Sequence, residues 1–363
     1  MFSCVRFEVA RKRRGYNKSD LAGRIGVELR TVTAYESGEF EPSAETLAAI
    51  AKTLDFPESW FSAGDIHQPS PQTASFRSQA RMSAGNRHAA LAAGALAFLL
   101  NDWLENRFTL PPPASNLPDL REEEPEAAAM LLRQQWGLGE KPVKNIVHLL
   151  ESKGIRVFSM AEDTTEVDAF SLWRETTPFI FLNTMKSAER SRFDAAHELG
   201  HLVLHRHGDL RGKEIEHQAN SFASAFLMPR GSILAHAPVL PSLNGLIKLK
   251  KFWIVSVAAL NYRLHQLGAL SDWHYNKLCI EIGQKGYRTQ EPEGAQREMS
   301  LIFPQLFKTL RDDGYTKSDI AAELHFNAEE IDKLVFGLIL VALEGGTRHA
   351  GTKRSKVELR LVE

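Results

Sequence analysis

The chain has 363 residues, of which 43% are hydrophobic and 25% are charged, and its formal net charge at pH 7 is −1. These values are ordinary for a globular protein with two or three domains, and they exclude a protein that coats DNA through overall positive charge. Its two cysteines are too few for a disulfide framework. The start of the chain lacks a signal-peptide pattern, and the longest apolar run, residues 89–100, is too short to span a bilayer. We therefore expect a cytoplasmic protein that does not enter a membrane.

Residues 1–66 have the pattern of a compact helical module. Apolar positions recur at helical spacing in four segments, which are separated by Gly15, Gly26 and Gly38. The small side chain of Ala22 allows two helices to approach closely, and Gly26 suits the turn between them.

The segments 18–27 and 31–38 of this module resemble a helix-turn-helix of the Cro/CI type (XRE family). The resemblance implies binding to a double-stranded DNA operator by a recognition helix at residues 28–37, often as a homodimer that matches two half-sites. The candidate DNA contacts are the base readers Arg30 and Thr33, the neighbouring Thr31, and the phosphate contacts Lys18, Arg13 and Arg14. The alternative is a helical bundle that contacts only proteins, because acidic and basic residues nearly balance in this module.

Residues 67–119 are expected to form a linker and a helix. The stretch 67–82 is polar and contains two prolines, as linkers often do. Residues 83–108 are rich in alanine and apolar on at least one face, which predicts a helix, and the prolines at 111–113 then break the chain.

Residues 120–239 are expected to form a second domain, in which helices come before strands. A helix is predicted from residue 120, with acidic residues at its N-terminus, and a second at 143–153. Three short segments, 155–159, 167–173 and 178–183, are rich in residues that favour strands and predict a small sheet. The whole chain is therefore predicted to be mainly α-helical with a small β-sheet, an α+β fold.

A helix predicted at residues 190–205 carries His197, Glu198 and His201 in an H-E-x-x-H arrangement. Residues four apart share a helix face, so the two imidazoles can bind one metal ion while Glu198 reaches a water on it. The alternative is a surface helix with two ordinary histidines, but the apolar pattern around them predicts burial, which is costly for unpartnered polar groups. Catalytic zinc takes three protein ligands. Among residues of the following acidic segment Glu216 is favoured as the third, with Glu214, His217 and Asp209 as competitors.

The segments 193–205, 215–223 and 227–229 resemble the ImmA/IrrE metallopeptidases, and the resemblance covers approximately residues 120–235. It implies a zinc endopeptidase (Zn2+ as cofactor) that cuts a regulatory protein, such as a helix-turn-helix repressor or an antitoxin-like partner. In the family pattern the third ligand corresponds to Glu216. Gln218 departs from the pattern, because many members carry a second acid at this position.

Three further residues surround the motif. Asp194, one helical turn before His197, is a candidate for holding a ligand imidazole, with a simple solvent contact as the alternative. His205 and His207 are candidates for stabilising an oxyanion, although a surface position is the alternative for each.

Residues 240–363 are predicted to be mostly helical, at 247–267, 272–282 and 301–310, with a basic tail from Arg348. The segment 314–321 repeats the sequence of 15–22, which indicates a second, degenerate helix-turn-helix. Its reading face would hold three acidic residues that phosphate repels, Glu329, Glu330 and Asp332. We therefore expect this repeat to be a packing or partner surface.

These patterns together predict a DNA-binding transcriptional regulator fused to a zinc-dependent endopeptidase, with Glu198 as the general base. The alternative is a regulator whose zinc or ligand-sensing domain has no catalytic activity. A change of Glu198 distinguishes the two, because only the enzyme needs this carboxylate.

Overall fold

The structure, a computed structural model, describes residues 1–71, 74–76, 83–112, 117–160, 168–206, 212–339 and 357–358. It divides into two compact units. Unit 1 consists of Met1–Pro111, Phe158–Asp168 and Leu301–Glu363, and unit 2 consists of Pro112–Val157 and Ala169–Ser300. The predicted α+β class is confirmed, since helices dominate and strands are few. The division by sequence differs from these units, because residues 240–300 group with the metal-motif segment and residues 301–339 group with the N-terminal module.

The N-terminal module of unit 1 is a bundle of five helices. These are α1 (Cys4–Arg13), α2 (Lys18–Ile25), α3 (Leu29–Ser37), α4 (Ala44–Leu54) and α5 (Glu58–Ser62). A capping box of Asn17 and Asp20 starts α2, and Gly26 ends it with a φ of 71°, a left-handed conformation that glycine adopts without strain. The turn at Gly26 then leads into α3, as the sequence predicts.

Unit 1 continues with one long helix and three C-terminal helices. Its further elements are β1 (Ala74–Phe76), α6 (Ala84–Glu105), β2 (Phe108–Thr109), α15 (Ile302–Asp312), α16 (Lys317–Leu324), α17 (Ala328–Val335) and β6 (Val357–Glu358). Strand β6 pairs in parallel with β2. No side chain of α6 between Ala89 and Phe98 is exposed, as expected for its apolar, alanine-rich sequence.

The predicted C-terminal repeat has the local structure of the N-terminal one. A capping box of Thr316 and Asp319 starts α16, as the equivalent box starts α2. His325 ends α16 at a φ of 60°, where Gly26 ends α2. The start and the end of α16 therefore have the same local conformation as those of α2, with a left-handed histidine where α2 has a glycine.

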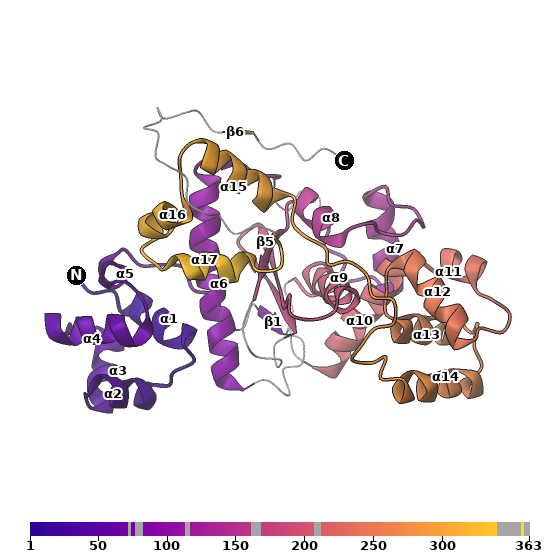
Figure 1. Ribbon diagram of the computed structural model, residues 1–363, viewed down its shortest axis with the longest axis horizontal. Helices are drawn as coiled ribbons and strands as arrows, with labels where there is room; N and C mark the ends of the chain where they lie inside the picture. The colour runs from indigo at the N-terminus through magenta and orange to yellow at the C-terminus, as the bar shows by residue number, and fades with distance from the viewer. Residues whose placement is uncertain are drawn as a thin grey trace. The chain divides into compact units, whose positions relative to one another are not determined.

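Unit 2 is built from helices around a short antiparallel hairpin. Its elements are α7 (Pro125–Gln135), α8 (Ile146–Ser152), β3 (Arg156–Ser159), which begins in this unit, β4 (Ala169–Arg174), β5 (Thr177–Leu182), α9 (Ala188–Leu204), α10 (Lys213–Leu227), α11 (Arg230–His236), α12 (Leu243–Trp253), α13 (Val257–Gln266) and α14 (Asp272–Gln284). Strands β4 and β5 pair with Ser171 opposite Ile180, and β3 lies on the other side of β5. Figure 1 shows α9 and α10 next to each other, with α9 also packed on β4 and β5.

Gly200 permits the close packing of α9 on α10. A Cβ atom at this position would lie 3.0 Å from a ring carbon of Phe222 and 3.4 Å from the Cα of Ala219. A larger residue would therefore require the Phe222 ring or the backbone of α10, which carries Glu216, to shift.

The prediction of one continuous helix at residues 247–267 is wrong. The structure divides it into α12 and α13, with Ile254 in a left-handed conformation (φ 57°) and Ser256 capping the start of α13. The apolar periodicity continues across the break, so the pattern alone predicts a single helix. None of the helices in the described part of the chain is long and apolar enough to cross a membrane.

Candidate metal centre

The three favoured metal ligands meet between α9 and α10. The Nε2 atoms of His197 and His201 lie 3.0 Å apart, and each lies 3.5 Å from a carboxylate oxygen of Glu216. Both histidines are buried, whereas the Glu216 side chain is 29% exposed. One side of the cluster is therefore open to a substrate or to water.

These distances suit a tetrahedral zinc ion. Zinc–ligand bonds of about 2.0–2.1 Å at tetrahedral angles place neighbouring donor atoms about 3.3 Å apart. The observed separations of 3.0 and 3.5 Å bracket that value. Two imidazoles and one carboxylate are also a donor set that catalytic zinc sites use, with the fourth position left for water.

The competitors for the third ligand position lie elsewhere. Glu214 and His217 are exposed on α10, and Glu214 accepts a hydrogen bond from Gln218. Within the described residues, the ligand atoms of His197, His201 and Glu216 are the one group of three close enough to hold a metal ion. Asp209, the last competitor, lies outside the described residues, as does His207.

The cluster keeps Glu216 ionised. Burial would raise the pKa of this carboxyl group, but hydrogen bonds and charge interactions with His197 and His201 outweigh it and lower the pKa to about 2. The carboxylate is therefore available as a ligand at neutral pH.

Glu198, the candidate general base, is buried against the sheet. Its Oε2 accepts a hydrogen bond of 2.7 Å from the hydroxyl of Ser171 on β4. The contact of Ser171 with Glu198 was not predicted from the sequence. A serine among the apolar residues of this buried strand was the signal, because such a hydroxyl needs a partner.

The ligand imidazoles have partners on their far nitrogens. The Nδ1 atom of His197 lies 3.2 Å from the Oδ1 of Asn220, and the Nδ1 of His201 lies 3.0 Å from the Nδ1 of His205. Asp194, the residue predicted to hold an imidazole, is buried and forms an ion pair with Lys186 at 3.5 Å. Asn220 and His205 are therefore the partners that fix the orientation of the two metal-binding rings.

His205 does not suit the predicted role of oxyanion donor. It is buried, and both of its ring nitrogens are engaged, one with His201 and the other with Gln218 at 2.9 Å. Burial lowers its pKa, although the hydrogen bond to Gln218 opposes this. The alternative prediction, a surface position for His205, is also wrong, because the ring is buried and its Nδ1 contacts His201 one turn earlier on α9.

The candidate DNA contacts fall into two groups. Arg30 and Thr33 are exposed on α3, as base readers must be, and Thr31 on the same helix is half-buried. The Nε atom of Arg30 lies 2.7 Å from a carboxylate oxygen of Glu28, and Lys18 pairs with Glu36.

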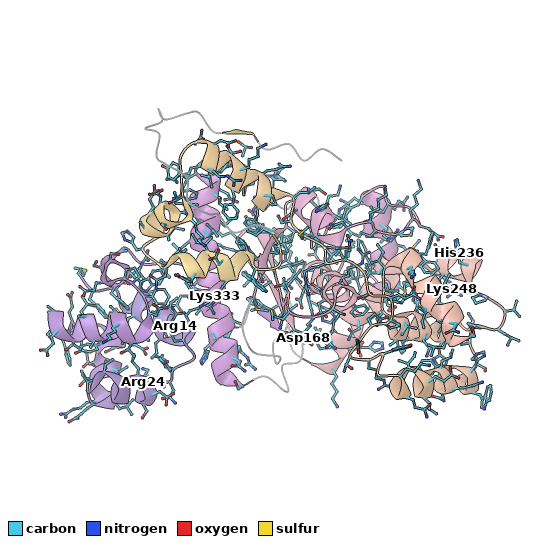
Figure 2. The ribbon with its side chains drawn as sticks, in the orientation of Figure 1. Arg14, Arg24, Asp168, His236, Lys248 and Lys333 are labelled. Atoms are coloured by element: carbon cyan, nitrogen blue, oxygen red, sulfur yellow. The ribbon has the colours of Figure 1, made fainter. Side chains whose placement is uncertain are left out.

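The prediction that Arg13 and Arg14 contact phosphate needs a correction, because both pair with an acidic side chain of the same unit. The Arg13 side chain is 5% exposed and pairs with Glu330 of α17 at 2.8 Å. Arg14 pairs with the same carboxylate at 2.6 Å, and Lys333 of α17 also pairs with Glu330. Figure 2 labels Arg14, at the end of α1, and Lys333. These two cations are engaged in ion pairs within the chain, which does not suit a phosphate contact. The predicted packing role of the acidic face of the second repeat is borne out at Glu330.

Two parts of the chain match known families. Residues 150–265 match the family model of the IrrE N-terminal-like domain, and residues 8–61 match a family of helix-turn-helix domains. No curated protein matches the chain. The chain therefore joins an XRE-type helix-turn-helix domain to a metallopeptidase-family domain of the ImmA/IrrE type.

Proposed function

We propose that the chain is a transcriptional regulator with its own zinc-dependent endopeptidase, which cleaves a regulatory protein. The observation that carries the proposal is the cluster of His197, His201 and Glu216, with Glu198 beside it on the same helix. The match of residues 150–265 to a metallopeptidase family supports it.

The residues of the cluster have separate roles in this mechanism. His197, His201 and Glu216 would hold the ion, and zinc bound there would supply a Lewis acid for a peptide carbonyl and for water. Glu198 accepts the proton of the attacking water and passes it to the departing amine. The Ser171 hydroxyl holds one oxygen of Glu198, so the carboxylate keeps one orientation during both transfers.

The substrate class comes from the resemblance to ImmA/IrrE enzymes, which typically cut helix-turn-helix repressors. A repressor or an antitoxin-like partner is therefore the substrate that we propose. The exposed Arg30 and Thr33 of α3 would read an operator in double-stranded DNA, as a monomer or as a homodimer. A regulator that binds operator DNA acts where that DNA is, so we propose a cytoplasmic location.

The experiment that tests catalysis compares the wild type with Glu198→Gln. Both proteins are loaded with zinc and incubated with a library of peptides from a proteome digest, and new termini are identified by mass spectrometry. The wild type should cut peptides and Glu198→Gln should not, while both retain equal zinc by elemental analysis. A zinc-loaded wild type that cuts nothing would favour the rival function, a regulator with a non-catalytic metal or ligand sensor.

A further inference from the structure

A chain of hydrogen bonds leads away from the metal cluster on the side opposite the ligand atoms. The Nδ1 of His201 lies 3.0 Å from the Nδ1 of His205, and the Nε2 of His205 lies 2.9 Å from the Oε1 of Gln218. The amide nitrogen of Gln218 then donates to Glu214 at 3.3 Å. Four side chains from α9 and α10 are thus connected in one sequence.

If His201 binds a metal ion, the chemistry of these groups decides which atom is the donor in each of these hydrogen bonds. His201 turns its Nε2 toward His197 and Glu216, so this nitrogen needs a free lone pair to bind a metal ion. A neutral imidazole carries one proton, so with a metal ion on Nε2 the proton of His201 would be on Nδ1 and would be donated to His205. His205 would then accept at Nδ1, carry its own proton on Nε2 and donate it to the Gln218 oxygen.

Gln218 completes this arrangement because its two ends differ. Its amide oxygen accepts from His205, and its amide nitrogen donates to the Glu214 carboxylate. An apolar side chain at this position would leave the Nε2–H of His205 without its partner, and this is costly because the His205 ring is buried. The polar residue at 218 is therefore tied to the protonation pattern of both histidines.

The same contacts also hold the two ligand-bearing helices together. His205 caps the C-terminal end of α9, whereas Glu214 and Gln218 flank the ligand Glu216 by two residues on each side near the start of α10. The His205–Gln218 bond thus joins α9 to α10 close to the point where Glu216 must meet His197 and His201.

We propose that His205 and Gln218 are positioning residues that fix His201 as the Nδ1–H tautomer, with its Nε2 lone pair aimed at the metal ion. This inference rests on the proposed metal site and extends it to two residues outside the ligand set. Neither residue belongs to the proposed ligand set, and their effect passes through His201.

The test uses the full chain and two variants of one residue. Gln218→Leu removes the acceptor with little change in size, whereas Gln218→Glu keeps an acceptor oxygen toward His205. Gln135→Leu is the matched control, because Gln135 is exposed on α7 of the same unit. Thermal unfolding of each apo protein shows whether the variants fold.

Zinc affinity, measured by competition with a chromogenic chelator, is the first readout. Loss of a hydrogen-bond partner behind a metal ligand weakens metal binding by about 10- to 100-fold. We expect a loss at the lower end of that range, about tenfold, for Gln218→Leu, because Gln218 acts on His201 through His205. Affinities within about threefold of the wild type are expected for Gln218→Glu and Gln135→Leu.

The second readout is the tautomer of His201 in the zinc-loaded protein, from the nitrogen shifts of its imidazole in NMR spectra. The wild type should show a proton on Nδ1 and a metal-bound Nε2, and Gln218→Leu should show a mixed population. If folded Gln218→Leu binds zinc as tightly as the wild type with an unchanged tautomer, the inference is wrong while the metal site stands. A wild type that binds no zinc would overturn the metal site itself.

Discussion

Arg13 of α1 and Glu330 of α17, which are 317 residues apart in the sequence, form a buried ion pair. Glu330 also pairs with Arg14 and Lys333, so one carboxylate neutralises three cations from α1 and α17. The pair joins the N-terminal helix-turn-helix to its C-terminal repeat within unit 1. The recognition-helix position of the repeat is therefore used for packing.

Glu330→Gln should weaken the attachment of α17 to α1. Removing one partner of a buried ion pair leaves the other charge without compensation, which costs about 3–5 kcal/mol. Hydrogen exchange of the α17 amides at pH 7 measures the loss. Glu329→Gln, at an exposed position of the same helix, is the control and should leave exchange unchanged. Equal protection in all three proteins would contradict the role of the pair.

The same carboxylate predicts a pH dependence. Burial would raise the pKa of Glu330, but the charges of Arg13, Arg14 and Lys333 outweigh it and lower the pKa to about 2. A folded-state pKa below the unfolded value means that the stabilisation is present at neutral pH and is lost as the pH falls from about 4.5 toward 2. The free energy of unfolding should therefore fall less steeply over this range in Glu330→Gln than in the wild type, as urea titrations at each pH would show. Parallel curves would contradict the assignment.

The sequence predicts the metal cluster better than it predicts this ion pair. His197 and His201 follow from local helical spacing, whereas Glu216 was favoured from a set of four candidates in the following segment, and the family resemblance supported that choice. The Arg13–Glu330 contact depends on how two distant segments pack, and a run of basic residues at the end of α1 looks the same whether it faces phosphate or a buried acid. The break at Ile254 was missed because a left-handed residue leaves no mark on apolar periodicity.

Gly200→Ala should separate α9 from α10. Its new Cβ would meet Phe222 at 3.0 Å, and overpacking of this kind costs about 1–3 kcal/mol. This cost exceeds the stabilisation of about 1 kcal/mol expected from the higher helix propensity of alanine. We expect a lower melting temperature and weaker zinc binding. Gly23→Ala in α2 is the control, because its Cβ would meet no atom within 4 Å, and it should be neutral or stabilising. A Gly200→Ala protein as stable as the wild type would show that the two helices are not in close contact.

Ser171→Ala should lower the turnover of cleaved peptides while leaving zinc affinity unchanged. Its hydroxyl contacts the Glu198 carboxylate at 2.7 Å and makes no contact with the three metal ligands in the bonds described. Loss of a hydrogen bond to a buried charged group costs about 1–3 kcal/mol, so a decrease in kcat of about tenfold or more is expected. Ser171→Thr, which keeps the hydroxyl, should recover part of the rate. A loss of zinc in Ser171→Ala would instead indicate a structural role.

Arg30→Ala should weaken specific DNA binding, because Arg30 is exposed at the start of the recognition helix. A side chain that reads a base contributes about 1–3 kcal/mol to discrimination, or about tenfold or more in affinity. The DNA is a sequence selected from a random library by the wild-type protein, and binding is measured at one fixed salt concentration. Arg230→Ala, which removes an exposed charge from α11, is the control. Equal DNA affinity of the two variants would contradict the prediction that Arg30 contacts a base.

The zinc content of the purified wild type beside that of His197→Ala tests the central claim most directly. His197 contributes one of the three donor atoms that lie within 4.8 Å of one another, so the wild type should hold about one zinc ion per chain and the variant should lose it during dialysis. Thermal unfolding at matched conditions confirms that the variant is folded. Equal zinc in the two proteins, or none in either, would contradict a metal centre between α9 and α10.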